Sequence, residues 1–450
     1  MRPALEAEKI GIPSVVVTTT GFSTFARVLA KASGIENLSI AEYPGAVGNH
    51  HPDEIREKVQ NVLFDRVIDG LTTSEETPAR IADTAWNPRE VVFGGTLEQI
   101  NTYFRNNEWA DGLPIIPPTA ERVEEFLKYT DRSPNEEVAV LAPAHLKAVP
   151  WNIAVNAVMA GCQPEHMPLI IAAVEALADD NYHLNNIGSS SALWPYVLVN
   201  GPIVGQLGIE AGGQLISKGP NPAIGRAIGL IVRNIAGYRP GDNYMGTFGY
   251  PMVFTLAEND KESPWEPFHV EHGFDREMST VTLGITNNWG HAPAPSSKPE
   301  KSGTQIILEI LCKELAKKFR LHANPGRGSR AAKLMITLLL APPVAKTLAA
   351  SGYSKQRLKA YLYENAKLPL GEFQWAQRYT SGLQTTEEIP GDPNEMVRLL
   401  PSPDDLHIIV CGDPNRNRMM SFEGAHAQPT TKLIKLPPGW ANLLEERRLK

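Results

Sequence analysis

Apolar and polar positions along the first 75 residues follow two alternating periods. The run PSVVVTTT (13–20) is almost continuously β-branched, which is typical of a strand buried in a parallel sheet. A helical period follows over residues 22–34, then a second strand pattern over 36–44, and then a long amphipathic helix over 52–71. Because strands that alternate with helices form parallel sheets with crossover connections, we predict a small parallel α/β unit over residues 1–75.

The rest of the chain repeats this pattern on a larger scale. Residues 76–92 are largely polar and are interrupted by two prolines, which predicts a linker. Beyond it, β-rich apolar runs such as WPYVLVNG (194–201) alternate with helical patterns such as GTQIILEILCKELAKKF (303–319). We therefore predict a larger α/β domain over residues 93–450, and α/β as the fold class of the chain.

Two helical patterns meet at Cys162. The first ends at Gly161, a favoured residue just past a helix end, and the second begins at Pro164, with Glu165 and His166 in its first turn. A thiol at a helix N-terminus lies at the positive end of the helix dipole, which lowers the thiol pKa toward the reactive thiolate. Cys162, Glu165 and His166 are therefore candidate catalytic residues. The alternative is an inert cysteine buried between two core helices.

A second group of candidate catalytic residues follows the apolar run MVFTLAEN (252–259). This run contains Glu258, an expected acid or base, and His269 comes shortly after it as an expected proton carrier. Together with Glu271 and His272, His269 also offers two imidazoles and a carboxylate that can ligate a metal ion. The HExxH spacing of helical metalloproteases is absent. A metal-dependent hydrolase or lyase is therefore the alternative enzymatic interpretation.

Small polar side chains and arginines are the candidates for substrate binding. Amides and hydroxyls around a glycine can present hydrogen-bond donors to a carboxylate, carbonyl or phosphate, and a loop at a helix N-terminus can cradle an anion. Other candidates lie at the carboxyl ends of predicted strands, where ligands bind in parallel sheets. The candidates are Thr19, Asn186, Ser189, Ser190, Arg226 and Arg416. Turns, caps and salt bridges are the structural alternatives.

Composition and charge narrow the classes of protein that this chain can be. An apolar content of 42% and a charged content of 21% over 450 residues are typical of a soluble globular protein with about two to three domains. A formal charge of −7 does not indicate the excess of basic residues that binds nucleic acid or an anionic membrane. No apolar run reaches the roughly 20 residues of a membrane span, and the N-terminus lacks a signal peptide's apolar region, which predicts a cytoplasmic location.

The three cysteines, Cys162, Cys312 and Cys411, are far apart in the sequence. Their spacing predicts neither a disulfide framework nor a zinc cluster. The sequence identifies no cofactor.

The runs EAEKIGIPSVVVTTTGF (6–22) and AKASGIENLSIAEYPGAVGN (30–49) resemble the UGSC-motif (seleno)protein family. More distantly, they resemble the selenocysteine-bearing subunit of glycine reductase and its proline reductase relatives. A block from NAVMAGCQPEH (156–166) to SPWEPFHVEHGF (263–274) is similar to the large domain found with, or beside, UGSC-type units.

In these families a redox loop with cysteine or selenocysteine comes immediately before the helix that here begins with Arg2 and Pro3. No cysteine precedes Cys162 in this sequence. Three explanations remain open: loss of the redox function, supply of the motif by another chain, or a start site placed downstream of a selenocysteine codon.

The resemblance implies sulfur or selenium redox chemistry, such as reductive cleavage or thiol transfer. We therefore predict a small-molecule enzyme acting on a small anionic substrate, with Cys162 as nucleophile or redox thiol. From another class of protein, the alternative is a subunit that binds substrate for a partner redox protein. We also predict a homo-oligomer, because a small N-terminal unit leaves a sheet edge that needs cover.

Overall fold

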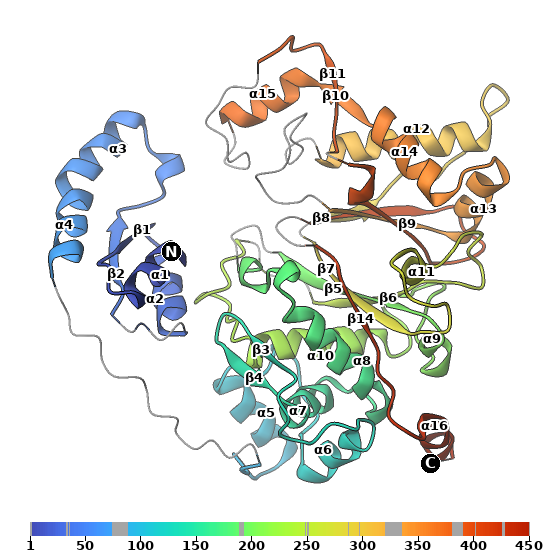
Figure 1. The fold of residues 1–450 in the computed structure, drawn as a ribbon, viewed down its shortest axis with the longest axis horizontal. Coiled ribbons are helices and arrows are strands. Elements are labelled where there is room, and N and C mark those ends of the chain that lie inside the picture. Colours follow the sequence, from blue (N-terminus) through green and yellow to red (C-terminus); the bar gives the residue numbers. More distant parts are fainter. Residues whose placement is uncertain are drawn as a thin grey trace.

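The computed structural model describes residues 2–32, 35, 37–73, 89–188, 193–247, 249, 252–286, 288–296, 298–319, 335–379, 390–400, 402–424 and 428–449. Within them the chain folds into a small parallel sheet near the N-terminus and larger mixed sheets, all accompanied by helices (Figure 1). The predicted fold class, α/β, is confirmed. Most of the predicted linker lies outside the described residues.

The N-terminal unit is built on two parallel strands, with Val17 opposite Ala41. Its elements are α1 (Arg2–Lys9), β1 (Val15–Thr19), α2 (Ser23–Ala32), β2 (Ser39–Tyr43), α3 (Pro52–Lys58) and α4 (Phe64–Thr72). Val16 of β1 packs into a small core with Leu5 of α1. Helix α4 lies close against the sheet, since a Cβ at Gly70 would come within 2.6 Å of a methyl group of Val15. The predicted order of strands and helices in this unit is confirmed.

The larger part contains two four-stranded mixed sheets (Figure 1). The first sheet has the order β14 (Thr430–Leu433), β7 (Thr280–Thr286), β5 (Trp194–Asn200), β6 (Phe254–Ala257). The second has the order β12 (Leu406–Val410), β9 (Met335–Leu340), β13 (Met419–Gly424), β8 (Asn288–His291). Strands β6 and β12 are thus edge strands of their sheets among the described residues.

The two sheets pack face to face, and the side-chain alternation of their strands shows it. Tyr196 and Leu198 of β5 share one apolar cluster with Leu339 of the second sheet, whereas Val197 and Val199 belong to another cluster on the opposite face. The hydroxyl groups of Tyr196 and Thr337 lie 2.7 Å apart across the two sheets. The larger part is therefore a sandwich with two sheets at its centre.

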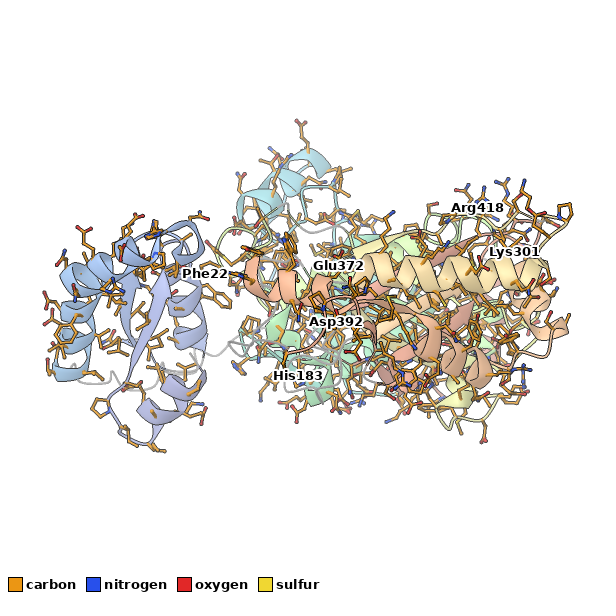
Figure 2. All side chains as sticks on the ribbon, turned by 90° about the horizontal axis from the view of Figure 1, so that it is seen from above. Phe22, His183, Lys301, Glu372, Asp392 and Arg418 are labelled. Carbon is orange, nitrogen blue, oxygen red and sulfur yellow. The ribbon has the colours of Figure 1, made fainter. Side chains whose placement is uncertain are left out.

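Helices cover the outer face of each sheet. Helices α8 (Met167–Leu177) and α10 (Asn221–Asn234) pack directly on the first sheet. Helices α5 (Leu97–Asn106), α6 (Ala120–Leu127) and α7 (Pro150–Ala160) belong to the same apolar cluster, and α7 packs on α8 and α10. Helices packed with the second sheet include α12 (Gly303–Phe319), α13 (Pro342–Ala350), α14 (Lys355–Asn365) and α15 (Leu370–Tyr379). Charged side chains such as Lys301, just before α12, lie at the surface, where Lys301 pairs with Glu309 (Figure 2).

The remaining elements are short or lie at the end of the chain. They are the hairpin β3 (Ala139–Leu141)–β4 (Leu146–Ala148), the antiparallel pair of β10 (Lys367–Pro369) and β11 (Met396–Arg398), which α15 separates in sequence, and the helices α9 (Ile203–Gln206), α11 (Phe268–Glu271) and α16 (Trp440–Arg448). Among the described helices, none combines the length and apolar character that crossing a membrane requires.

The edges of the two sheets meet where β6 and β12 end. The backbone N–H of Asn259, just after β6, donates to the carbonyl oxygen of Val410 at the end of β12, at 2.8 Å. Strand β5 runs parallel to β6, so Asn200 ends β5 beside the end of β6. Polar groups that follow these strands are thereby gathered at one place in the fold.

Candidate functional site

Glu258 follows strand β6, and its side chain is completely buried. Its Oε2 accepts hydrogen bonds from Asn200 Nδ2 and from the backbone N–H of Phe268, both at 2.6 Å. Burial raises the pKa of the Glu258 carboxyl above its usual value, although the charge of Lys355 and the Phe268 hydrogen bond oppose this shift. A carboxyl group with a raised pKa can exchange protons closer to neutral pH.

Lys355, the first residue of α14, places an ammonium group beside this carboxyl. Its Nζ lies 3.4 Å from Oε1 of Glu258 and 3.0 Å from Oε2 of Glu271, and its side chain is only 2% exposed. Helix α11 supplies Glu271, so this contact joins α11 and β6 to the helical layer of the second sheet. The three side chains form a buried network of two carboxylates and one ammonium.

His269 of α11 adds an imidazole to the same place, and the charge of Glu258 acts on it. Its Nε2 lies 3.3 Å from the carbonyl oxygen of Arg276. Because a carbonyl only accepts, Nε2 carries the hydrogen and Nδ1 keeps its lone pair. Burial lowers the pKa of His269, so the imidazole is neutral at neutral pH, and its buried Nδ1 has no hydrogen-bond partner among the described residues. We call Asn200, Glu258, His269, Glu271 and Lys355 the Glu258 cluster.

Other polar atoms next to the Glu258 cluster are also unpaired within the described part of the chain. The side-chain oxygen of Asn200, the hydroxyl of Thr280 opposite Asn200 on β7, and one carboxyl oxygen of Asp260 are buried without a hydrogen-bond partner. Burial raises the pKa of Asp260, against the charges of Arg276 and Lys355. Buried polar groups are nearly always paired in folded proteins, so these atoms are positioned to pair with water or with a bound polar molecule.

Cys162 lies in the core of the larger part, at 6% exposure, between α7 and the turn that precedes α8. Its predicted position after a helix that ends at Gly161 is confirmed, because Gly161 has the left-handed φ of +88°. The expected thiolate is wrong: burial raises the pKa of Cys162 far above its usual value, and the charge of Arg226 does not offset this. A helix dipole contributes about 0.3–1 kcal/mol, whereas full burial shifts a pKa by up to about 3–5 units.

The other thiols are also held in the protonated form. Burial raises the pKa of Cys411, and the nearby charge of Glu258 raises it further. Burial also raises the pKa of Cys312 to about 11. None of the three cysteines has the lowered pKa that marks a catalytic thiol.

We therefore expect all three thiols to resist Ellman's reagent in the native protein at pH 8. A thiol with an ordinary pKa is roughly a quarter ionised at this pH, whereas one with a pKa near 11 is ionised to about one part in a thousand. Denaturation in guanidinium chloride should release all three within minutes. Rapid release of a thiol from the native protein would contradict the burial and the raised pKa values described above.

Glu165 and His166 lie in the 3-10 turn Pro164–His166 before α8, apart from the Glu258 cluster in the fold. Oε2 of Glu165 is 3.4 Å from Nε of Arg447 in the C-terminal helix α16. Nδ1 of His166 accepts a hydrogen bond from the backbone N–H of Gln163 at 3.1 Å, and burial lowers the pKa of His166 to about 4. These contacts hold the turn in place, so Glu165 and His166 each have a structural role.

Among the described residues, no group of three or more histidine, cysteine, aspartate or glutamate side chains is arranged to hold a metal ion.

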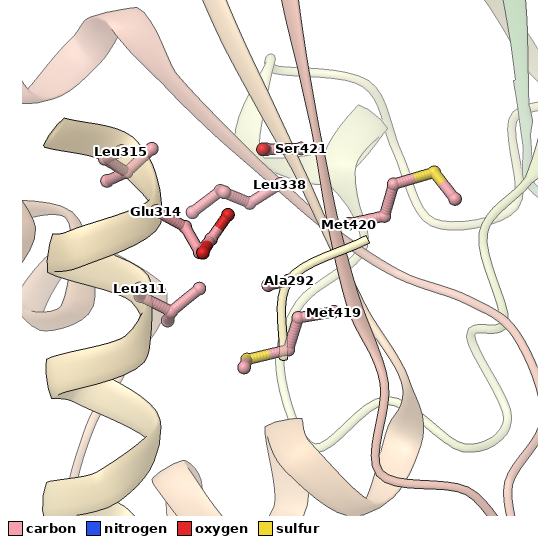
Figure 3. Close-up of a pocket in the computed structure, with 8 residues that line it drawn as sticks. All are labelled: Ala292, Leu311, Glu314, Leu315, Leu338, Met419, Met420 and Ser421. Carbon is pink, nitrogen blue, oxygen red and sulfur yellow. The ribbon is translucent and has the colours of Figure 1, made fainter. Parts of the chain in front are cut away.

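A small hollow lies between α12 and strands β9 and β13 of the second sheet (Figure 3). Its lining is mostly apolar and includes Leu311, Leu338 and Met419, with Glu314 and Ser421 as polar exceptions. Most of these apolar residues belong to the core of this layer, so the hollow fits core packing better than catalysis.

Comparison with known proteins bears on the N-terminal part of the chain. Residues 1–73 match the UGSC family. The resemblance predicted for this stretch is confirmed, whereas the more distant resemblance to selenocysteine subunits stays a prediction. No curated protein and no solved structure matches the chain.

The UGSC segment, residues 1–73, holds Thr19 at the carboxyl end of β1, where it is half-buried. The neighbouring Thr20 hydroxyl donates to Oε1 of Glu42 and accepts from the backbone N–H of Gly45, both at 3.0 Å. Hydrogen bonds from Ser23 and Thr20 lower the pKa of Glu42. Polar groups at the carboxyl ends of the two strands are thus hydrogen-bonded to one another within the UGSC segment.

Arg226 of α10 is already paired. Its guanidinium makes two hydrogen bonds of 2.9 Å to the carboxylate of Asp111 and a further one of 2.9 Å to the carbonyl oxygen of Pro114. Burial acts to raise the pKa of Asp111, but the hydrogen bonds and charge of Arg226 outweigh it and lower that pKa. These contacts match the salt-bridge alternative for Arg226.

The other substrate-binding candidates are dispersed. Nε of Arg416 lies 3.0 Å from Oδ2 of Asp413, at the exposed end of the turn after β12. Asn186 is half-buried in a 3-10 turn, and its backbone N–H donates to the carbonyl of His183 at 2.8 Å. Ser189 and Ser190 lie outside the described residues. Of the candidates taken from the sequence, the structure brings Glu258, His269 and Glu271 together.

Asn200 and Lys355 are members of the Glu258 cluster that sequence patterns did not single out. Asn200 is the last residue of an apolar run with a strand pattern, and Lys355 is the first residue of a helix that Ser354 caps. One signal was present: a lysine in the first turn lies at the positive end of the helix dipole, where cations are disfavoured. Such a lysine needs carboxylate partners, and Glu258 and Glu271 provide them.

Proposed function

We propose that this chain is an enzyme that carries out acid–base chemistry on a small, polar, anionic substrate at the Glu258 cluster. The observation that carries this proposal is the neutral His269 imidazole with a free Nδ1 lone pair beside a buried carboxyl group of raised pKa. Pairs of titratable groups whose surroundings push their pKa values in opposite directions are the usual basis of acid and base roles.

The geometry suggests a role for each side chain. His269 Nδ1 is the proton acceptor, because it is the ring nitrogen without a hydrogen. Glu258 is paired with Lys355 as a carboxylate, and because burial raises its pKa it can take up a proton nearer neutral pH and act as the donor. Lys355 supplies a fixed positive charge that stabilises negative charge developing on the substrate. Asn200 and the Phe268 N–H hold the Glu258 carboxyl in place.

A purely structural ion-pair network is the competing explanation for these residues. Buried ion pairs are costly to desolvate and contribute little net stability, so stability alone is a weak reason to keep one. The unpaired atoms of Asn200, His269, Asp260 and Thr280 add to that cost. A bound substrate that satisfies these atoms accounts for all of them together.

Sulfur or selenium redox chemistry is the second candidate, and the UGSC match of residues 1–73 is the observation that favours it. The thiols of this chain are protonated and largely buried. In this version, the reactive thiol or selenol belongs to a partner protein, and the chain binds the substrate for it.

Solvent exchange distinguishes the two proposals. The protein is incubated in D₂O with 2-hydroxy, 2-oxo and 2-amino acids and small phosphate monoesters, and C–H signals are followed by proton NMR. We expect exchange or conversion in at least one class, at a rate that Cys162→Ala changes by less than about twofold, because the buried thiol takes no part in the proton transfer. Loss of turnover in a folded C162A variant, or no exchange in any class, would count against acid–base chemistry.

A further inference from the structure

Two buried, unpaired polar side chains lie opposite each other where β5 ends and β7 begins. Asn200 is the last residue of β5 and Thr280 the first of β7, and the antiparallel register pairs them directly. Opposed positions of these strands share one face, since a Cβ at Gly284 would lie 2.3 Å from Cζ of Tyr196, its partner. Asn200 and Thr280 are four positions further along and share that face, which packs against the second sheet. Cβ atoms of directly opposed residues lie about 4.5–5.5 Å apart, so one small group can contact both side chains.

The free atom of Asn200 is a hydrogen-bond acceptor. Its Nδ2 donates to Oε2 of Glu258 at 2.6 Å, and the same oxygen accepts from the backbone N–H of Phe268. Because the carboxylate only accepts, it fixes which end of the Asn200 amide faces it. The remaining amide atom, Oδ1, is buried without a hydrogen-bond partner among the described residues. A group that pairs with this oxygen must therefore carry a hydrogen.

The hydroxyl of Thr280 complements this acceptor. Its Oγ1 is also buried without a hydrogen-bond partner in the described part of the chain. A hydroxyl group on a ligand can donate to Oδ1 of Asn200 and accept the hydrogen of Thr280. A carbonyl or carboxylate oxygen carries no hydrogen, so it would leave Oδ1 of Asn200 unpaired. An ammonium group has no lone pair, so it would leave the hydrogen of Thr280 unpaired.

His269, the proposed proton acceptor, lies at the same place. Asn200 Nδ2 and the Phe268 N–H are both 2.6 Å from one oxygen of Glu258, and His269 is the residue after Phe268. Nε2 of His269 donates to the carbonyl oxygen of Arg276, whose own side chain is 51% exposed. The buried groups therefore lie directly beneath an exposed loop, in which residues 275–278 face solvent.

We propose that Asn200 and Thr280 form a subsite that recognises a hydroxyl group of the substrate. This inference rests on the proposed function, because the recognised hydroxyl lies beside the two groups that are assigned to proton transfer, Glu258 and His269. The substrate class is therefore a small hydroxy acid. Water can form the same two hydrogen bonds and is the competing occupant of the subsite.

Pairs of acids that differ by a single hydroxyl group test the subsite without any turnover. Lactate and propionate, malate and succinate, and mandelate and phenylacetate are titrated into the full chain, with both enantiomers of each hydroxy acid, and dissociation constants are measured by ligand-observed NMR. In at least one pair, we expect the hydroxy acid to bind at least about tenfold more tightly, because its analogue leaves two buried groups unpaired. Equal affinities in all pairs, or no binding of any acid, would overturn the subsite and leave water as its occupant.

An amino acid of the same shape tests the kind of group that is recognised. Alanine carries an ammonium group where lactate carries its hydroxyl, and pyruvate carries a carbonyl oxygen there. Both should bind at least about tenfold more weakly than lactate if lactate is the preferred acid of its pair, because each leaves one buried group unpaired. Tighter binding of alanine or pyruvate than of any hydroxy acid would contradict recognition of a hydroxyl group.

Thr280→Val removes the hydroxyl and keeps the shape of the side chain. It should weaken binding of the preferred hydroxy acid by about five- to tenfold and change that of its analogue by less than about twofold. The matched control is Thr255→Val on β6. The Thr255 hydroxyl is equally buried and unpaired, but its neighbours Phe254 and Leu256 face the second sheet, so Thr255 lies on the opposite face. An unchanged preference in T280V, or an equal loss in T255V, would count against the subsite.

Failure of the subsite is distinguishable from failure of the proposed function. Glu258→Gln keeps an oxygen that accepts from Asn200, so it should retain the preference for the hydroxy acid while its turnover is lost. Full turnover in E258Q with the preference intact would overturn the proposed function alone. Turnover by the wild-type protein without any preference for a hydroxyl group would overturn the subsite alone.

Discussion

Replacing Lys355 by methionine should lower the free energy of unfolding by about 3–5 kcal/mol, since removing one member of a buried ion pair leaves charge uncompensated. Lys355 is only 2% exposed and lies within 3.4 Å of Glu258 and 3.0 Å of Glu271. Its removal leaves the carboxylates of Glu258 and Glu271 without their shared counter-ion and raises the pKa of Glu258 further. Urea denaturation followed by circular dichroism measures the loss.

Two comparisons show whether burial is the cause of this loss. Lys346 of α13 pairs with Glu262 at the surface, so Lys346→Met should cost less than about 1 kcal/mol. Combining Lys355→Met with Glu258→Gln removes one of the two carboxylates that have lost their counter-ion, and should restore about half of the lost stability. A loss in K355M no larger than that in K346M would mean that Lys355 is not buried between two charges.

Replacing Gly225 by alanine should destabilise the protein by about 2–3 kcal/mol, although alanine normally favours a helix. Gly225 lies in α10, where the helix packs against the start of β6. A Cβ at this position would lie 2.2 Å from the carbonyl oxygen of Val253 and 3.1 Å from Cα of Phe254. These are backbone atoms, so the helix must shift away from β6, the strand that Glu258 follows.

Gly229, one turn further along α10, is the matched control. A Cβ there would meet only a methyl group of Val253, at an ordinary 3.6 Å. Gly229→Ala should therefore be neutral or stabilise the protein by up to about 1 kcal/mol through helix propensity. Thermal unfolding of both variants measures the difference, and equal effects would contradict the close approach of α10 to β6.

Much of the fold follows from local patterns in the sequence. The β-branched run at 13–20 and the apolar run at 194–201 became β1 and β5, and the helix that stops at Gly161 became α7. The face-to-face packing of two sheets was not predictable in the same way. Strand β5 is buried on both sides, so its continuous apolar run does not show which side chains face the other sheet.

The candidate site was only partly predictable, because its members come from distant parts of the chain. Glu258 and His269 are close in sequence and were recognisable as acid–base residues, whereas Lys355 lies 97 positions after Glu258. Cys162 shows the opposite case. Its local sequence suggests activation by a helix dipole, but burial has the larger effect on its pKa and depends on tertiary packing.

Turnover by Glu258→Gln is the most direct test of the claim that the Glu258 cluster is the functional centre. Glutamine keeps the shape of the side chain and an oxygen that accepts from Asn200 and Phe268, but it cannot donate the carboxyl proton. In the D₂O exchange assay, we predict a loss of about 10²–10⁴-fold relative to the wild-type protein. The exposed control Glu262→Gln should retain full turnover. Wild-type turnover in a folded E258Q variant would contradict this assignment.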